Sequence, residues 1–184
     1  MRKSIPKQIK VSKTAPKNVY LVGFMGTGKS AVGRELAKKW KWHFVDLDEL
    51  IELREKRTIA EIFACEGEPY FRRVESRVLR EVVGERNFVV ACGGGIVLEK
   101  VNILTMKEEG FVVCLSASIP VILKRTCKET HRPLLKVKDP RKQIELLLKM
   151  RAPYYALADK MINTSKLTVK QVVGKILKIL TRQR

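Results

Sequence analysis

Short runs of apolar residues alternate along the chain with longer stretches in which apolar residues recur every three or four positions. Short apolar runs between turn residues are typical of buried strands, and a period near 3.6 residues is typical of helices. The pattern predicts strands over residues 19–22, 43–45, 88–91, 111–115 and 161–162. It predicts helices over residues 28–40, 58–65, 71–82, 101–109, 118–126, 140–148 and 168–180. Strands that alternate with helices indicate an α/β fold with three layers, a five-stranded parallel sheet with helices on both faces.

Several of the predicted helix ends carry capping signals. The stretches 58–61 and 168–171 have the sequences Thr-Ile-Ala-Glu and Thr-Val-Lys-Gln, which fit capping boxes. Pro140 follows an aspartate and suits the first turn of a helix. Gly110 suits the C′ position after the helix over 101–109, a position that is often left-handed.

Residues 23–30 have the sequence Gly-Phe-Met-Gly-Thr-Gly-Lys-Ser and directly follow the first predicted strand. This GxxxxGK[ST] spacing between a strand and a helix is typical of a loop that wraps nucleotide phosphates. Its glycines let backbone N–H groups approach the phosphate oxygens, Lys29 reaches the β- and γ-phosphates, and the Ser30 hydroxyl ligates Mg²⁺. A chance match has odds on the order of one in a hundred for a chain of this length and glycine content. The motif therefore predicts that the chain binds ATP and Mg²⁺.

Polar or glycine-rich residues follow the next two predicted strands as well. Asp46 and Asp48 come after the second strand, and three glycines, 93–95, come after the third. Because ligands of parallel sheets bind at the carboxyl ends of the strands, we expect these residues and the phosphate loop to share one edge.

The chain has 184 residues, of which 45% are hydrophobic and 31% charged, as in a single globular domain. Its formal net charge of +19 raises the question of nucleic-acid binding. Residues 1–18 hold six basic and no acidic residues, residues 160–184 hold seven and none, and the remaining 25 basic and 19 acidic residues leave the middle at +6. Basic residues on a tail and a terminal helix usually form a solvated face, and no aromatic–basic interleaving indicates a platform for bases. We expect no dedicated nucleic-acid partner.

We expect residues 1–17 to be a basic disordered tail and residues 18–184 to form one domain. No apolar run approaches the ~18 residues that a membrane span requires, and the N-terminus lacks the apolar segment of a secretory signal. The four cysteines, which show no CxxC spacing, are Cys65, Cys92, Cys114 and Cys127. Buried reduced thiols are the expected state, rather than disulfides or a metal site. The expected location is the cytoplasm and the expected state a monomer.

Six separated motifs occur along the chain. They are residues 23–30, Asp46-Leu47-Asp48, Gly67-Glu68 with Phe71-Arg72-Arg73-Val74-Glu75, Gly93-Gly94-Gly95, Arg132-Pro133-Leu134-Leu135 and Arg151-Ala152-Pro153-Tyr154-Tyr155. With these motifs in this order, over about residues 18–180, the chain resembles the shikimate kinases, P-loop kinases of the nucleoside-monophosphate-kinase-like group. The first motif alone would indicate only a phosphate-binding loop, whereas the combination is specific. The resemblance implies ATP-dependent phosphorylation of shikimate to shikimate 3-phosphate, in the biosynthesis of chorismate and aromatic amino acids.

The resemblance implies a set of residues around the nucleotide. They are Gly26, Thr27, Gly28, Lys29, Ser30, Ala31, Arg125 and Arg132. Mg²⁺ is implied to be held by Ser30 and, through water, by Asp46, and Arg125 to stack on adenine. Arg132 belongs to an implied mobile lid over about residues 127–140 and neutralises charge on the transferred group when the lid closes. Ala31 stands where threonine is common in the family, which removes one possible phosphate contact.

The resemblance also implies a shikimate site, which involves an insert of about residues 47–75. Its residues are Asp48, Arg72, Gly93, Gly94, Gly95 and Arg151. Arg72 and Arg151 are implied to bind the carboxylate, the glycines to contact the ring, and Glu75 to orient the first arginine. Asp48 is implied to align the attacking hydroxyl group, as a base or as an orienting group. The implied catalytic residues are Lys29, Asp48 and Arg132.

Each of these residues also has an ordinary structural explanation, such as an acid at a helix start, a solvated arginine or a flexible turn. Two other functions stay open. One is another small-metabolite kinase of the same fold, for gluconate or a nucleoside monophosphate, although those lack the Phe-Arg-Arg-Val-Glu and triple-glycine combination. The other is a basic ATP-binding protein associated with nucleic acid.

Overall fold

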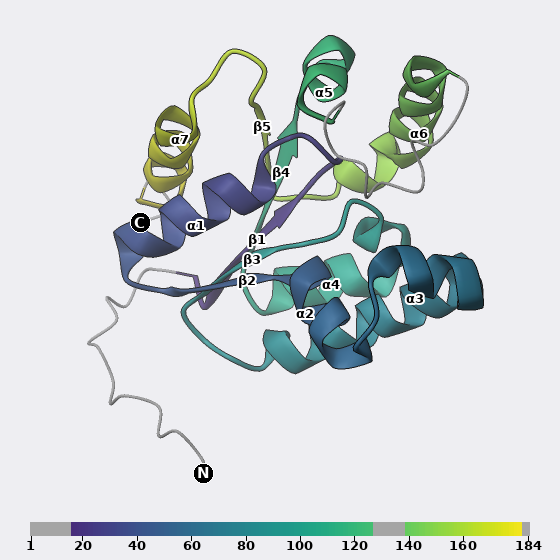
Figure 1. The fold of residues 1–184 in the computed structure, drawn as a ribbon. Helices are drawn as coiled ribbons and strands as arrows, with labels where there is room; N and C mark the ends of the chain where they lie inside the picture. The colour runs from purple at the N-terminus through teal and green to yellow at the C-terminus, as the bar shows by residue number, and fades with distance from the viewer. Residues whose placement is uncertain (1–15, 127–138, 182–184) are drawn as a thin grey trace.

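The computed structural model describes residues 16–126 and 139–181 (Figure 1). The expectations for the tail before residue 16, for most of the lid and for Cys127 and Arg132 concern residues outside this description. A parallel sheet with the strand order β2-β3-β1-β4-β5 lies at the centre of the structure. Its strands are β1 Asn18–Val22, β2 His43–Asp46, β3 Phe88–Ala91, β4 Phe111–Ser116 and β5 Lys160–Asn163.

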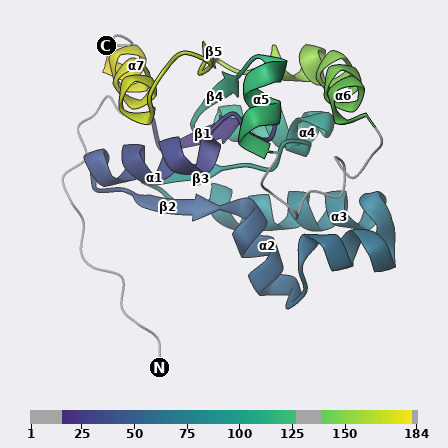
Figure 2. The ribbon, with the colours of Figure 1, turned by 45° about the horizontal axis from the view of Figure 1, so that its top comes forward.

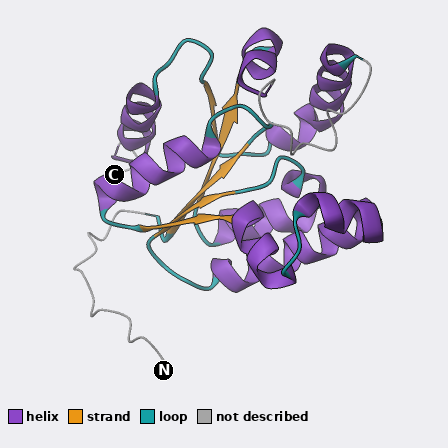
Figure 3. Ribbon diagram, in the orientation of Figure 1, coloured by secondary structure: helices purple, strands orange, loops and turns teal. Residues whose placement is uncertain are grey.

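Helices alternate with these strands along most of the chain (Figure 3). They are α1 Lys29–Trp40, α2 Leu47–Glu55, α3 Ile59–Val83, α4 Lys100–Glu108, α5 Ile119–Thr126, α6 Pro140–Tyr155 and α7 Val169–Thr181, with a 3₁₀ turn, η1 Ile96–Leu98, before α4. Across the described ranges, no helix has the length and apolar character needed to cross a membrane.

Alternate residues of β1 pack against helices on opposite faces of the sheet. Val19 and Leu21 share a core cluster with residues of α1 and α7, whereas Tyr20 and Val22 share one with residues of α2, α3 and α4. Figure 2 shows α1 and α7 on one side of the strands and α2 and α3 on the other. Because helices cover both faces, every residue of β1 is buried. The expected three-layer α/β fold with a five-stranded parallel sheet is confirmed.

Helix α2 was not among the predicted helices, and a helix start was considered only as an alternative explanation for Asp46 and Asp48. Asp46 is its N-cap and accepts a hydrogen bond from the backbone N–H of Asp48. Leu47 and Ile51 are buried and lie four residues apart, a helical spacing that was present in the sequence.

The predicted helices over 58–65 and 71–82 are joined in α3. Its capping box at Thr58 and Glu61 is present as expected. Helical geometry is interrupted at Gly67, whose φ is 75° and ψ is 175°. Pro69 follows in the first turn after this break, where its missing N–H removes no helical hydrogen bond. Gly67 and Pro69 thus let α3 change direction.

Two predictions are wrong in detail: the burial of Cys65 and the left-handed conformation of Gly110. Cys92 and Cys114 are buried free thiols as expected, but Cys65 is exposed, because the first part of α3 buries Ile62 rather than Cys65. Gly110 follows α4 but is not among the residues with positive φ. A glycine is needed there for space: a Cβ would lie 2.4 Å from the carbonyl oxygen of Asn18.

Replacing Gly110 with Ala is expected to destabilise the protein. The added methyl group would also lie 2.9 Å from a ring carbon of Tyr20, so β1 or this ring must move. Overpacking of this kind lowers the free energy of unfolding by about 1–3 kcal/mol. Urea denaturation followed by circular dichroism measures the change. Gly174→Ala on α7 is the matched control, because nothing lies within 4 Å of its added Cβ, and should gain about 0.5–1 kcal/mol. Equal stability of Gly110→Ala and the wild type would contradict the prediction.

Candidate active site

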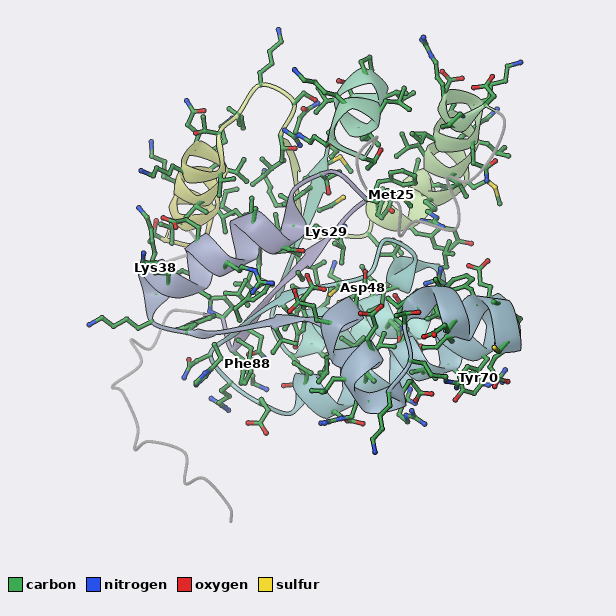
Figure 4. All side chains as sticks on the ribbon, in the orientation of Figure 1. Met25, Lys29, Lys38, Asp48, Tyr70 and Phe88 are labelled. Atoms are coloured by element: carbon green, nitrogen blue, oxygen red, sulfur yellow. The ribbon has the colours of Figure 1, made fainter. Side chains whose placement is uncertain are left out.

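The phosphate loop, residues 23–28, connects β1 to α1 at the carboxyl edge of the sheet. Gly26 and Gly28 have φ values of 73° and 94°, in the region that side chains disfavour. Nζ of Lys29 donates hydrogen bonds to the carbonyl oxygens of Gly23 at 2.9 Å and Phe24 at 3.1 Å. The ammonium group therefore lies against the loop, and Lys29 and Asp48 appear together in the centre of Figure 4. This backbone and cation form a site suited to phosphate.

The loop is held in place by its own apolar residues and by Thr27. Phe24 and Met25 are buried in a cluster with residues of α5 and α6. The Thr27 hydroxyl is buried and donates to the carbonyl oxygen of Phe24 at 2.7 Å. These contacts fix the shape of the loop.

Arg125 and Thr164 connect the phosphate loop to the end of β5. A guanidinium nitrogen of Arg125 donates to the carbonyl oxygen of Gly26 at 3.0 Å, and the guanidinium also binds the hydroxyl and carbonyl oxygens of Thr164 at 3.3 Å. Thr164 is buried and donates to the carbonyl oxygen of Thr27 at 3.0 Å. Thr164 was not among the predicted site residues, although its position after the fifth predicted strand was a usable signal. Arg125 is placed beside the nucleotide loop, and its contact with adenine stays a prediction.

Ser30 and Asp46 form the part of the site that could hold a metal ion. The Ser30 hydroxyl donates to Oδ2 of Asp46 at 2.6 Å, while Oδ1 of Asp46 caps α2. Both supply hard oxygen atoms, which Mg²⁺ prefers, and Mg²⁺ at kinase sites needs only one or two carboxylates besides water and phosphate oxygens. Clusters of three or more His, Cys, Asp or Glu residues with metal-binding geometry do not occur in the part of the chain that the structure describes. The residues present thus fit Mg²⁺ bound together with a nucleotide.

Each glycine of the turn after β3 lies against a different predicted site residue. A Cβ at Gly93 would lie 2.3 Å from Oε1 of Glu75 and 3.0 Å from Oδ1 of Asp48. At Gly94 the nearest atoms are the carbonyl oxygen of Gly23 at 3.5 Å, with a guanidinium nitrogen of Arg151 and the backbone nitrogen of Met25 at 3.6 Å. At Gly95 a Cβ would lie 2.3–2.5 Å from the guanidinium of Arg72.

The contacts at Gly95 explain why this position has no side chain. Its φ of −103° is one that any residue adopts, so the backbone conformation alone does not require glycine. Space is the constraint, because the Arg72 guanidinium occupies the volume of a side chain.

Arg72 is held by two acids of its own helix, α3. Its guanidinium binds Oε2 of Glu75 at 2.6 Å and Oε1 of Glu68 at 2.9 Å. The Arg72 side chain is 12% exposed and that of Glu75 is 1% exposed. Glu75 therefore fixes the orientation of Arg72, as the resemblance implies.

Glu75 is also an unusual carboxyl group in its own right. Burial raises its pKa to about 7, although the nearby Arg72 and Arg151 act in the opposite direction. Oε1 of Glu75 is buried and has no hydrogen-bond partner among the described residues. This atom faces Gly93, beside Asp48, so it is a buried acceptor aimed at the same turn.

Arg151 reaches the turn from α6. It is 4% exposed, and its guanidinium carbon lies 5.7 Å from the centre of the Phe24 ring. No carboxylate among the described residues forms an ion pair with it within 4.0 Å. Glu75 interacts with this charge at longer range. A buried cation without a direct ion-pair partner is costly, so the position is suited to bind an anion.

The structure therefore brings Asp48, Arg72 and Arg151 to the triple-glycine turn, and the turn to the phosphate loop. Ala31, in the first turn of α1, is exposed. Arg132 and the rest of residues 127–138 lie outside the described part. The roles of these residues in binding and catalysis stay predictions at this point.

Comparison with known proteins identifies the family. The family model described as shikimate kinase matches residues 25–181. A shikimate kinase of Thermodesulfovibrio yellowstonii is 44% identical over 162 residues, which are 88% of this chain and 94% of that protein. The structure of the Acinetobacter baumannii shikimate kinase in complex with shikimate has a TM-score of 0.89 and 38% identity, with 94% of this chain and 96% of that chain covered.

A gluconokinase of Sinorhizobium meliloti is also similar in structure, with a TM-score of 0.61, but at 17% identity it shows a shared fold alone. The family match covers the phosphate loop from Met25 onward and the elements that carry Asp48, Arg72, the triple glycine and Arg151. The resemblance found in the sequence motifs is thus confirmed, and the chain belongs to the shikimate kinase family.

Proposed function

We propose that this protein transfers the γ-phosphoryl group of ATP to the 3-hydroxyl group of shikimate. The observation that carries the proposal is the triple-glycine turn, next to the phosphate loop, at which the buried Arg151 and the partly buried Arg72 meet from different helices. Shikimate carries one carboxylate and several hydroxyl groups, and planar guanidinium groups bind carboxylates through paired hydrogen bonds. The Acinetobacter baumannii relative was solved in complex with shikimate, which supports the same acceptor here.

At the donor end, the phosphate loop and Lys29 bind the phosphates of ATP. Ser30 and Asp46 would hold Mg²⁺, which neutralises charge on the phosphate oxygens when it is bound. Arg125 lies at the far side of the loop, where it would contact the base. Arg132, beyond the described residues, is expected to approach the transferred group.

At the acceptor end, Arg72 and Arg151 anchor the carboxylate, and Glu75 keeps Arg72 in position. Asp48 lies beside Gly93 and would accept a hydrogen bond from the hydroxyl that attacks. Phosphoryl transfer depends mainly on positioning and on neutralisation of charge, so the orientation of this hydroxyl is the main contribution of Asp48. We also propose that the protein acts as a cytoplasmic monomer in aromatic-compound biosynthesis.

A substrate panel tests the proposal. ADP release from MgATP is measured with shikimate, gluconate and AMP as acceptors, and ³¹P NMR locates the phosphate on the product. We expect turnover with shikimate but not with gluconate or AMP, and we expect the product to be shikimate 3-phosphate. Faster turnover with gluconate or AMP, or no shikimate-dependent turnover, would overturn the proposal.

Replacing Lys29 with Ala is expected to lower kcat by at least about a hundredfold, as removal of a preorganised stabilising group does in other enzymes. ADP release at saturating shikimate and ATP measures the effect. Lys38→Ala is the matched control, because Lys38 lies on the same helix and is exposed. If both variants keep wild-type kcat, Lys29 does not act on the phosphates.

Replacing Arg72 with Lys is expected to weaken shikimate binding by roughly 1.5–3 kcal/mol, the range for hydrogen bonds to charged groups. The substitution keeps the charge but removes the paired donors. Calorimetric titration with shikimate measures the affinity. The neighbouring Arg73 is exposed and lies over the Tyr70 ring, so Arg73→Lys should bind shikimate as the wild type does. Equal affinities for all three proteins would remove Arg72 from the site.

Replacing Asp46 with Asn is expected to raise the Mg²⁺ concentration for half-maximal activity by roughly tenfold or more, as loss of a water-linked metal partner does. Asn is as good an N-cap as Asp, so α2 should keep its stability. Magnesium titrations at fixed ATP give the readout, and thermal unfolding checks the fold. Glu49→Gln, an exposed acid on α2 that pairs with Arg34, is the control. An unchanged Mg²⁺ requirement in Asp46→Asn would argue against a metal role.

A further inference from the structure

Tyr155 is the last residue of α6, and its hydroxyl lies inside the proposed shikimate site. The residue is 5% exposed. Its hydroxyl donates to the carbonyl oxygen of Gly94 at 2.6 Å, across 61 positions of sequence. A side chain from the end of one helix thus holds the middle of the triple-glycine turn.

The same hydroxyl interacts with Arg151, one helical turn earlier on α6. Burial raises the pKa of Tyr155 to about 12, while a hydrogen bond and the charge of Arg151 act in the opposite direction. The hydroxyl therefore keeps its proton at neutral pH and remains a donor to Gly94. The same hydroxyl group thus holds the turn and lies close enough to Arg151 to interact with its charge.

Gly94 in turn contacts the phosphate loop. Its Cβ position lies 3.5 Å from the carbonyl oxygen of Gly23 and 3.6 Å from both the Met25 nitrogen and an Arg151 guanidinium nitrogen. A displacement of Gly94 would therefore alter the distance between the acceptor site and the phosphate loop.

We infer that Tyr155 is a positioning residue for shikimate: it fixes the Arg151 guanidinium and the Gly94 backbone relative to each other, so that both meet the acceptor in one arrangement. The inference rests on the proposed function. Tyr155 itself need not touch shikimate. Its hydroxyl acts through Arg151 and the turn, and loss of the hydroxyl affects the binding of shikimate more than that of ATP.

Tyr154 provides a matched control. It precedes Tyr155 on the same helix but is 36% exposed, and no hydrogen bond of its hydroxyl is found in the described residues. Tyr154→Phe and Tyr155→Phe remove the same atom from adjacent positions, so a difference between them reports the environment of the hydroxyl.

The experiment compares the wild type, Tyr155→Phe and Tyr154→Phe in steady-state kinetics, in calorimetric titrations with shikimate and in thermal unfolding. We expect Tyr155→Phe to raise the KM and Kd for shikimate about five- to tenfold, the effect of one lost buried hydrogen bond. The KM for ATP should stay within about twofold of the wild type, a split that marks loss of acceptor binding. Tyr154→Phe should match the wild type in all of these values.

A second comparison asks whether Tyr155 acts through Arg151. Tyr155→Phe is made in an Arg151→Lys background, in which the paired donors that Tyr155 positions are already lost. In this background, Tyr155→Phe should change the free energy of shikimate binding by less than about half of the change that it causes in the wild type. The reason is that the effects of substitutions within one interacting network are not additive. Full additivity would overturn the inference.

Several other results would overturn the inference about Tyr155. A loss of thermal stability in Tyr155→Phe with an unchanged shikimate KM would overturn the inference and make the hydroxyl purely structural. Equal effects of the two tyrosine variants would do the same. If the wild type shows no shikimate-dependent turnover, the proposed function and this inference fail together, whereas an active wild type with an unaffected Tyr155→Phe overturns the inference alone.

Discussion

The turn after β3 has no free space for a side chain at Gly93 or Gly95, and the site is organised around this constraint. The carboxylates of Glu75 and Asp48 lie against Gly93 and the guanidinium of Arg72 lies against Gly95, at distances that a side chain would block. Gly94, between them, lies next to the phosphate loop. Groups of opposite charge from α2, α3 and α6 can therefore surround one short stretch of backbone. A ligand at this turn would meet backbone and charged side chains at once.

The charges at this turn explain how the site can recognise an anion. Arg72 is neutralised by Glu68 and Glu75, whereas Arg151 is buried without a carboxylate partner among the described residues. Taking a cation out of water is costly unless it is paired, so an arriving carboxylate would restore the missing partner. The core clusters on both faces of the sheet supply the stability that lets the structure tolerate this arrangement.

Most of the fold could be predicted because its elements carry strong local signals. The strands around Tyr20 and Val112 are continuous apolar runs, and the capping box at Thr58 marks a helix start. Helix α2 was not predicted because it has only nine residues and buries only Leu47 and Ile51, which give a weak periodic signal. Gly110 was assigned a backbone role, yet the approach of β1, 92 positions earlier in sequence at Asn18, is what excludes a side chain. Local patterns do not contain such contacts.

The sequence by itself determined the chemistry: a phosphate loop, two aspartates after a strand, three glycines and arginines in the order of a known family. Residue types and local spacing carry this information, since backbone conformation and charge are properties of short segments. Only the tertiary structure decided which groups meet. It showed that Tyr155 holds Gly94 beside Arg151, that Thr164 supports the phosphate loop, and that Oε1 of Glu75 has no hydrogen-bond partner within the described residues. Tyr155 and Gly94 are 61 positions apart, and Thr164 and Thr27 are 137 positions apart. Such contacts depend on how helices pack against the sheet, so no local pattern could reveal them.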